Sequence, residues 1–278
     1  MMTNKHSTLN SLININKPII GMIHALPTAG SPKGYICNID ELYEHGIKEA
    51  KTLMEGGVDA LLIENAGDVP FQKPEKIGFE TIALMSVLGS KIIKEVNIPV
   101  GFNIVANAAK ASIACAKAAG AQFVRINQWA NAYIANEGFV EGAAAEALRY
   151  RNQIDARDIL IFADVHVKHG SHAIVSDRTV EEQARDVAFF NADIVIATGS
   201  RTGHPTSVKE IQEIKKGSNL PTIIGSGLTA ENAKDVLSVA DGAIVGVSLK
   251  DTGNMSGSTD INKVKHLMDI VRGLCLIL

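Results

Sequence analysis

The sequence contains few cysteines, few aromatic residues and no long apolar run. Its 278 residues include three cysteines, Cys37, Cys115 and Cys275, and no CxxC pair. Such a sparse, odd set is typical of a reduced intracellular protein rather than of a disulfide framework. No window of about 18 apolar residues is present, so no membrane span is predicted. The polar residues 1–17 lack the apolar segment of a secretory signal. We therefore expect a cytoplasmic protein.

Basic residues are not in excess either. The 27 Lys and Arg residues against 30 Asp and Glu give a formal net charge of −3. No run of Lys or Arg stands out, which argues against a nucleic-acid partner. The composition is instead aliphatic, because 46% of the residues are hydrophobic although only 5% are aromatic. It predicts a globular protein whose large core is filled by alanine and aliphatic side chains.

A pattern repeats along the chain: a short apolar run, rich in β-branched residues, precedes a helix-like stretch. The predicted strands are Pro18–His24, Asp59–Glu64, Ile98–Ile104, Gln122–Asn127, Asp158–Asp164, Asp193–Thr198, Pro221–Gly225 and Gly242–Gly246. The predicted helices cover residues 40–55, 77–95, 106–119, 140–153, 179–190, 207–216, 229–239 and 260–273. This alternation predicts βαβ units around a parallel sheet. We predict an α/β fold, a single-domain (β/α)8 TIM barrel over residues 1–278, with residues 1–17 as an extension capping the barrel bottom.

Loop lengths predict which end of the barrel carries the site. The turns from helix to strand are short, whereas several loops from strand to helix are long, such as 25–39, 128–139 and 165–178. In barrels the elaborated end, at the carboxyl ends of the strands, holds the site. Loop 128–139, with Trp129 and Tyr133, is a candidate lid over a ring-shaped ligand or, alternatively, a hydrophobic plug.

Several predicted strands end in polar residues that suit acid–base catalysis. The catalytic candidates are Asp164, Glu64, His166 and His24. Asp164 and His166 are two residues apart, so they are expected on the same face of the strand. Asp164 and Glu64 are the candidate carboxylate pair that divides acid and base roles. The alternative is that these side chains only tie loops to backbone N–H groups.

Other strand ends suit ligand binding. Asn65, Asn103, Arg125, Asn127 and Thr198 are candidates for binding hydroxyl or carboxylate groups. An internal ion pair of Arg125 with Glu64 or Asp164 is the alternative for that arginine. No lysine lies within a predicted strand, which argues against Schiff-base chemistry.

Glycines after the last two strands suit phosphate. Gly225, Ser226 and Gly227 follow the seventh strand, and Gly246 ends the eighth. Barrels often bind phosphate with backbone N–H groups at these two positions, and glycine permits the close approach. Lys250 is a candidate for adding a positive charge, or else a solvated loop lysine.

A divalent metal is the less favoured reading of segment 164–172, which contains Asp164, His166 and His169. No strict metal-binding spacing is present, so solvent-exposed loop histidines are the preferred interpretation. We predict no metal and no cofactor.

The sequence resembles the BtpA/SgcQ family. The matching stretches are Ile20–Pro27, Gly57–Asn65, Pro99–Asn103, Phe123–Asn127, Ala163–His169 and Gly199–Gly203, and the resemblance extends from about Lys17 to Gly273. It implies a barrel similar to phosphoribosylanthranilate isomerase and related phosphate-binding barrels. One branch of the family is described as a photosystem I biogenesis factor, and another is loosely labelled a nucleosidase or sugar-metabolism protein.

Three functions therefore compete. The preferred one is an enzyme for a phosphorylated sugar or nucleoside, with nucleosidase-type or isomerase-type acid–base chemistry. The alternatives are a non-catalytic assembly factor of the photosystem I biogenesis type and a metal-dependent hydrolase. A small phosphorylated substrate is the expected partner. The apolar residues 274–278 also raise the prospect of a homo-oligomer.

Overall fold

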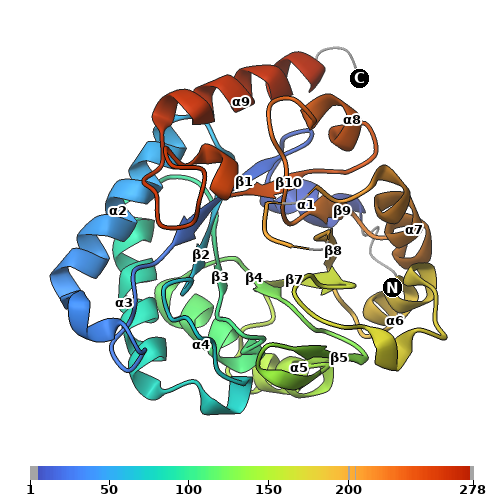
Figure 1. The fold of residues 1–278 in the computed structure, drawn as a ribbon, viewed down its shortest axis with the longest axis horizontal. Helices are drawn as coiled ribbons and strands as arrows, with labels where there is room; N and C mark the ends of the chain where they lie inside the picture. The colour runs from blue at the N-terminus through green and yellow to red at the C-terminus, as the bar shows by residue number, and fades with distance from the viewer. Residues whose placement is uncertain (1–5, 200, 204, 276–278) are drawn as a thin grey trace.

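The computed structural model describes residues 6–199, 201–203 and 205–275. Eight parallel strands close into a barrel, with each strand hydrogen-bonded to two neighbours (Figure 1). In the order around the barrel they are β1 (Ile19–His24), β10 (Ala243–Val245), β9 (Thr222–Ile224), β8 (Ile194–Ala197), β7 (Leu160–Val165), β4 (Phe123–Ile126), β3 (Val100–Asn103) and β2 (Ala60–Glu64). Seven of them lie within their predicted runs, and β7 extends one residue beyond its run, to Val165, so the predicted single-domain TIM barrel is confirmed.

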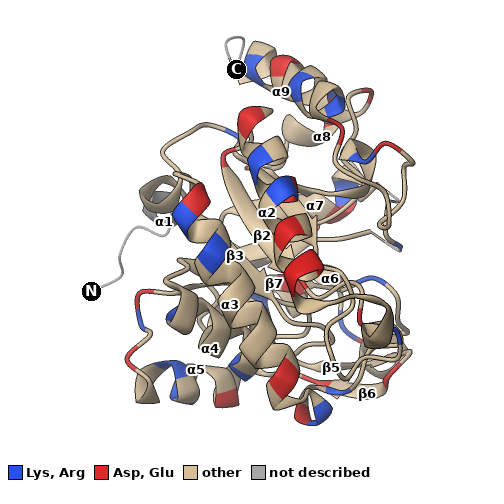
Figure 2. Cartoon of the chain, turned by 90° about the vertical axis from the view of Figure 1, so that its left-hand side faces the viewer, with Lys and Arg blue, Asp and Glu red and all other residues tan. Residues whose placement is uncertain are grey.

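Helices form the outer layer of the barrel (Figure 1). They are α2 (Ile39–Glu55), α3 (Phe79–Glu95), α4 (Ala109–Ala119), α5 (Ala144–Gln153), α6 (Val180–Phe189), α7 (Val208–Ser218), α8 (Ala233–Leu237) and α9 (Ile261–Cys275). Two of them begin with a capping box, Asn38 with Glu41 on α2 and Thr179 with Glu182 on α6. Each pair satisfies N–H groups at the start of its helix reciprocally. In the view of Figure 2 both acidic and basic residues lie along α2 and along α9.

The inside of the barrel is packed with apolar side chains. One buried cluster joins inward-facing residues of the strands, among them Phe123 and Phe162, whose rings stack 4.6 Å apart. Leu9, from α1 (His6–Leu12), and Ile13 belong to the same cluster and are each 4% exposed. The N-terminal segment therefore contributes to the barrel interior. A Cβ on Gly101 would lie 2.4 Å from the Phe123 ring, so the packing requires glycine there.

An antiparallel hairpin interrupts the chain between the fourth and fifth strands of the barrel. It consists of β5 (Ala132–Ala135) and β6 (Gly138–Glu141), which the sequence did not predict. The hairpin also shortens the predicted helix 140–153 to α5. Trp129, expected in a lid or plug, is instead fully buried in the layer between strands and helices, and its Nε1 donates to the Phe190 carbonyl at 3.0 Å.

The hairpin is tied to the loop after β7. Ile134 and Ser171 exchange two backbone hydrogen bonds of 2.8 and 3.0 Å. Tyr133 and Val140 pack with Val167 in a small separate cluster. Among the described helices, none has both the length and the apolar character needed to cross a membrane.

Candidate functional site

A cavity of about 630 Å³ lies at the carboxyl ends of the strands. Polar side chains from several strand ends face it, and loops 225–229 and 246–248 form one wall. Predicted site residues that line it are His24, Glu64, Arg125, Asn127, Gly225, Ser226, Gly227 and Gly246. Asn65, Asn103, Asp164, His166 and Thr198 are not among the lining residues.

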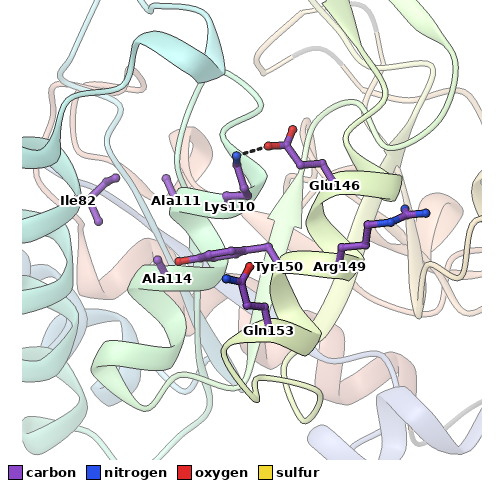
Figure 3. A pocket seen from close by; sticks show the side chains of 8 residues that line it. All are labelled: Ile82, Lys110, Ala111, Ala114, Glu146, Arg149, Tyr150 and Gln153. Carbon is purple, nitrogen blue, oxygen red and sulfur yellow. Dashed lines mark ion pairs between the residues drawn. The ribbon is translucent and has the colours of Figure 1, made fainter.

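Other hollows lie away from the strand ends. Figure 3 shows a groove of about 380 Å³ on the outer layer, where Lys110 and Ala114 of α4 face Glu146 and Tyr150 of α5. Lys110 and Glu146 form an ion pair across it, and both side chains are more than half exposed. Such an exposed pair contributes little energy. The barrel mouth, where polar groups converge in an enclosed space, is therefore the candidate site.

A buried ion pair forms the floor of the cavity. Arg125 on β4 donates from Nε and Nη2 to the two carboxylate oxygens of Asp164 on β7, each at 2.9 Å. Asn127 donates to the same carboxylate at 3.3 Å. The side chains of Arg125 and Asp164 are 3% and 0% exposed. Two parallel hydrogen bonds fix a guanidinium in one plane, so the geometry favours the ion-pair interpretation of Asp164 over an acid–base role.

Gly225 lets the loop after β9 pass directly over this guanidinium. A Cβ there would lie 3.1 Å from Arg125 Nη2 and 2.6 Å from Ile196. Any larger residue would therefore displace the arginine or the strand beneath it. The glycine that the sequence suggested for phosphate is thus also needed for packing.

Glu64, at the end of β2, faces the cavity. Its Oε2 accepts a hydrogen bond of 2.6 Å from Asn103 Nδ2 on the neighbouring strand β3. The strand register places His24, Glu64 and Asn103 side by side at one level of the barrel. Asn103 is 1% exposed and does not line the cavity, so it positions Glu64 rather than contacting a ligand.

His24 is held neutral at the end of β1. Burial, with a further contribution from the positive charge of Lys250, lowers the pKa of His24 to about 3. A Cβ on Gly246 would lie 2.9 Å from the His24 ring, so the ring packs closely against the strand end. Its Nδ1 is buried and has no hydrogen-bond partner in the described part of the chain. The imidazole therefore offers the cavity a neutral polar group.

His166 does not share a face with Asp164, and that prediction was wrong. His166 adopts a left-handed backbone conformation, with φ of 53°, which ends the alternation of β7. Its Nδ1 lies 3.2 Å from Glu210 Oε1, and its ring centre lies 4.2 Å from that of His172. His166 thus points away from the cavity, toward α7.

Lys168 enters the cavity in its place, and sequence analysis missed it. Its backbone N–H donates to Thr198 Oγ1 at 3.0 Å, which fixes the loop after β7 to the end of β8. Burial and the nearby charge of Arg125 lower the pKa of Lys168 to about 8, although Glu64 and Asp164 oppose this shift. The available signal was its position inside the stretch Ala163–His169 that carried the family resemblance.

Hydrogen bonds brace the loops after β9 and β10 against each other. Ser248 Oγ donates to the Leu228 carbonyl at 2.8 Å, and Gly227 has a φ of 77° that suits glycine. None of the hydrogen bonds found in the described part of the chain uses the backbone N–H groups of Gly227, Leu228, Val247 or Ser248. These groups are available donors at the cavity wall.

Lys250 plays neither role suggested for it. It is 1% exposed and forms an ion pair with Glu49 of α2, with Thr259 as a further partner at 3.2 Å. Asn65 also acts structurally, because it is fully buried, accepts from the Val105 N–H at 2.8 Å and donates to Asp68 at 2.9 Å.

The three residues suggested for a metal have separate partners. Asp164 bonds to Arg125, His166 lies beside Glu210, and His169 Nε2 lies 2.8 Å from Thr202 Oγ1. Within the described residues no cluster of three His, Cys, Asp or Glu side chains is arranged to hold a metal ion.

The fold and the cavity define a (β/α)8 barrel whose site lies at the carboxyl ends of the strands. The chain belongs to the BtpA family, which it matches over residues 15–273. A protein of Archaeoglobus fulgidus is 38% identical over 259 residues, covering 93% of this chain and 100% of that protein. The photosystem I biogenesis protein BtpA of Synechocystis is 31% identical over 255 residues, covering 91% of this chain and 88% of that protein.

Solved structures show the same fold at low sequence identity. Phosphoribosylanthranilate isomerase from Thermotoga maritima has a TM-score of 0.55 at 14% identity, covering 93% of this chain and 100% of that chain. Thiamine phosphate pyrophosphorylase from Pyrococcus furiosus has a TM-score of 0.56 at 14% identity, covering 93% and 96%. At this identity the likeness extends to the fold alone.

Proposed function

We propose that the protein is an enzyme that acts on a small phosphorylated sugar or nucleoside in the cavity at the barrel mouth. The observation that carries this proposal is that backbone N–H donors and ionisable side chains line the same cavity. Backbone N–H donors of residues 227–228 and 247–248, for which the described residues supply no acceptor, lie at one wall, and Glu64, His24 and Lys168 face the same cavity.

The phosphate is proposed to bind to the loops after β9 and β10. Backbone N–H groups bind a phosphate oxygen without the reorganisation that a flexible side chain needs, and glycine lets the anion approach closely. Lys168 and Arg125 add positive charge to the same cavity. The names of two structures of this fold, a phosphoribosyl isomerase and a thiamine phosphate enzyme, support a phosphorylated ligand by analogy of fold.

Proton transfer is proposed to fall to Glu64. Its carboxylate reaches the cavity while Asn103 holds one oxygen in place, and a positioned carboxylate is a suitable acid or base for sugar chemistry. Asp164 is proposed to act through Arg125, whose guanidinium it orients. Glu64→Gln should then reduce turnover by at least about a hundredfold, in the range typical of general acid–base groups.

The test of the phosphate site is a comparison of ribose 5-phosphate with ribose by calorimetry and thermal shift. A ligand at about a hundred times its dissociation constant stabilises the folded state by about 2.7 kcal/mol. We expect the phosphorylated sugar to bind and ribose to bind far more weakly. Ser248→Asp places a carboxylate beside the proposed phosphate and should weaken binding at least tenfold. Ser248→Asn is the matched control, with similar size and no charge, and should retain it.

Equal binding of ribose and ribose 5-phosphate would contradict the phosphate assignment. So would unchanged affinity in Ser248→Asp, provided that the variant is folded.

A role as an assembly factor is the second candidate. It is supported by the name of the Synechocystis relative and by exposed apolar side chains on the loop before α2 and at the start of α3: Tyr35 is 86% and Phe79 is 89% exposed. A stoichiometric protein partner that is lost in Tyr35→Ser or Phe79→Ser, together with no sugar-phosphate binding, would favour this role. The cytoplasmic location, the homo-oligomer and the absence of a cofactor stay predictions.

A further inference from the structure

The backbone at Lys168 and at the two residues before it is held in place by contacts with three other elements. His166 lies against Glu210 of α7, and Val167 is 4% exposed in the cluster with Tyr133 of the hairpin. The N–H of Lys168 itself donates to Thr198 Oγ1 at 3.0 Å. A side chain that starts from such a fixed backbone loses less freedom when it acts on a ligand. These contacts fix the point from which the Lys168 side chain enters the cavity, as expected for a residue that acts on a ligand.

No partner among the described residues explains the position of the Lys168 amino group on structural grounds. Within the described residues it forms no hydrogen bond and no ion pair, and the side chain is partly buried while lining the cavity. The two carboxylates whose charges act on Lys168 are otherwise engaged, Asp164 with Arg125 and Glu64 with Asn103. A structural lysine is expected to be paired, as Lys250 is with Glu49.

We propose that Lys168 is a covalent nucleophile that forms an iminium with the carbonyl group of an open-chain aldose or ketose phosphate. This inference rests on the proposed function, because it places the substrate phosphate on the loops after β9 and β10. It narrows the substrate class to sugar phosphates with a free carbonyl and disfavours simple hydrolysis of a glycosidic bond.

The step balances with groups that line the cavity. The Lys168 ammonium passes one proton to the Glu64 carboxylate, and the free amine then attacks the carbonyl carbon. A C–N bond forms, and the second amine proton moves to the former carbonyl oxygen, giving a carbinolamine. Glu64 returns its proton to that hydroxyl, the C–O bond breaks and water leaves. The net change is an ammonium and a carbonyl converted into an iminium and water.

The charge state of Lys168 suits this role. With a pKa of about 8, about a quarter of the amine is uncharged at pH 7.5, compared with about 0.1% of a lysine at about 10.4. The uncharged amine is the nucleophile. The environment of Lys168 thus raises the concentration of the reactive form by about two hundredfold.

The test is reductive trapping of the folded protein with dihydroxyacetone phosphate and sodium cyanoborohydride, followed by peptide mass spectrometry. Lys209, whose side chain is 84% exposed, is the internal reference. We expect Lys168 to be alkylated at least tenfold faster than Lys209, with a rate that rises through about pH 8. Dihydroxyacetone without phosphate should lose this selectivity.

Two variants make the outcome decisive. Lys168→Arg keeps the positive charge, so it should abolish the adduct while retaining the thermal shift with sugar phosphates. Ser248→Asp should reduce trapping by the phosphorylated probe alone. Alkylation of Lys168 no faster than that of Lys209 would overturn the inference. If sugar phosphates still bind in that case, the proposed function stands without it, and if they do not, both fail.

Discussion

Two loops of the barrel mouth, after β7 and after β10, each carry one lysine, and the two lysines have opposite environments. Lys250 is 1% exposed and paired with Glu49 and Thr259. Lys168 lines the cavity, and no ion pair to it is found in the described part of the chain. A buried ammonium with a dedicated carboxylate fastens a loop to a helix, whereas one without a carboxylate retains a charge that a ligand can use.

The difference comes from what each loop is anchored to. Glu49 lies on α2, in the outer layer of helices. Besides the Lys250 ammonium, its carboxylate accepts hydrogen bonds from the Thr259 N–H at 2.9 Å and from Thr259 Oγ1 at 2.7 Å. The loop after β7 is instead anchored through its backbone and through His166 and Val167. The amino group of Lys168 is therefore not needed to hold this loop in place.

The largest expected effect is the loss of the carboxylate that pairs with Lys250. Glu49→Gln leaves the ammonium buried beside a neutral amide, and removal of one partner of a buried pair costs about 3–5 kcal/mol. Urea unfolding measures this loss. The double variant Glu49→Gln with Lys250→Met is the control and should recover part of it. A loss below about 1 kcal/mol would mean that the pair is not structural.

The second effect concerns the other buried pair. Asp164→Asn leaves Arg125 with a neutral acceptor, and we expect a loss of about 2–4 kcal/mol in the free energy of unfolding. Because Arg125 lines the cavity and Lys250 does not, Asp164→Asn should also weaken sugar-phosphate binding. Glu49→Gln should leave that affinity within about twofold of wild type. Equal effects of Asp164→Asn and Glu49→Gln on sugar-phosphate affinity would contradict the distinction between the ion pair at the cavity and the ion pair away from it.

The third effect is acid destabilisation through His24. Its pKa is about 3 in the folded state and about 6.5 when unfolded, so the unfolded state binds more protons between these values. Stability is therefore full above about pH 6.5 and falls as the pH drops toward 3, by about 2–3 kcal/mol at pH 4.5. His24→Gln should remove this part of the dependence. Identical curves of stability against pH for the variant and the wild type would contradict a buried neutral histidine.

The smallest effect is a gain in stability, whereas the three variants or conditions above reduce it. Burial disfavours the charged form of Lys168, so below about pH 8, where Lys168 is charged in the folded state, this residue lowers the free energy of unfolding. Lys168→Met should therefore stabilise the protein by about 1–2 kcal/mol at pH 7, after allowance for the partial exposure of the side chain. The gain should fade between about pH 8 and 10.5. Lys209→Met is the exposed control and should change stability by less than about 0.5 kcal/mol.

The strands and their polar ends could be predicted because apolar runs and alternation are local properties. His24, Glu64 and Arg125 were found in this way, each at or near a strand end. Lys168 was missed because it lies four residues beyond the predicted strand end at Asp164, in a loop where alternation no longer indicates direction. The left-handed conformation of His166 lies between that strand end and Lys168. Nothing in a single sequence marks a histidine for that conformation.

Long-range pairing could not be predicted either. Lys250 and Glu49 are 201 residues apart, and a loop lysine gives no sign of its partner. The hairpin β5–β6 was missed because each of its strands has four residues, too few for alternation to stand out. Trp129 was assigned to a lid or a hydrophobic plug because it lies in that loop, although its size favours the core.

The central claim is that the barrel mouth binds a phosphorylated sugar through the loops after β9 and β10. Its most direct test is a titration of isotope-labelled protein with ribose 5-phosphate, monitored through the backbone amide resonances. We predict that the N–H signals of Gly227, Leu228, Val247 and Ser248 shift together and saturate, because these donors acquire a phosphate oxygen. Shifts confined to residues away from the cavity, or no saturable shift in these four, would contradict the account.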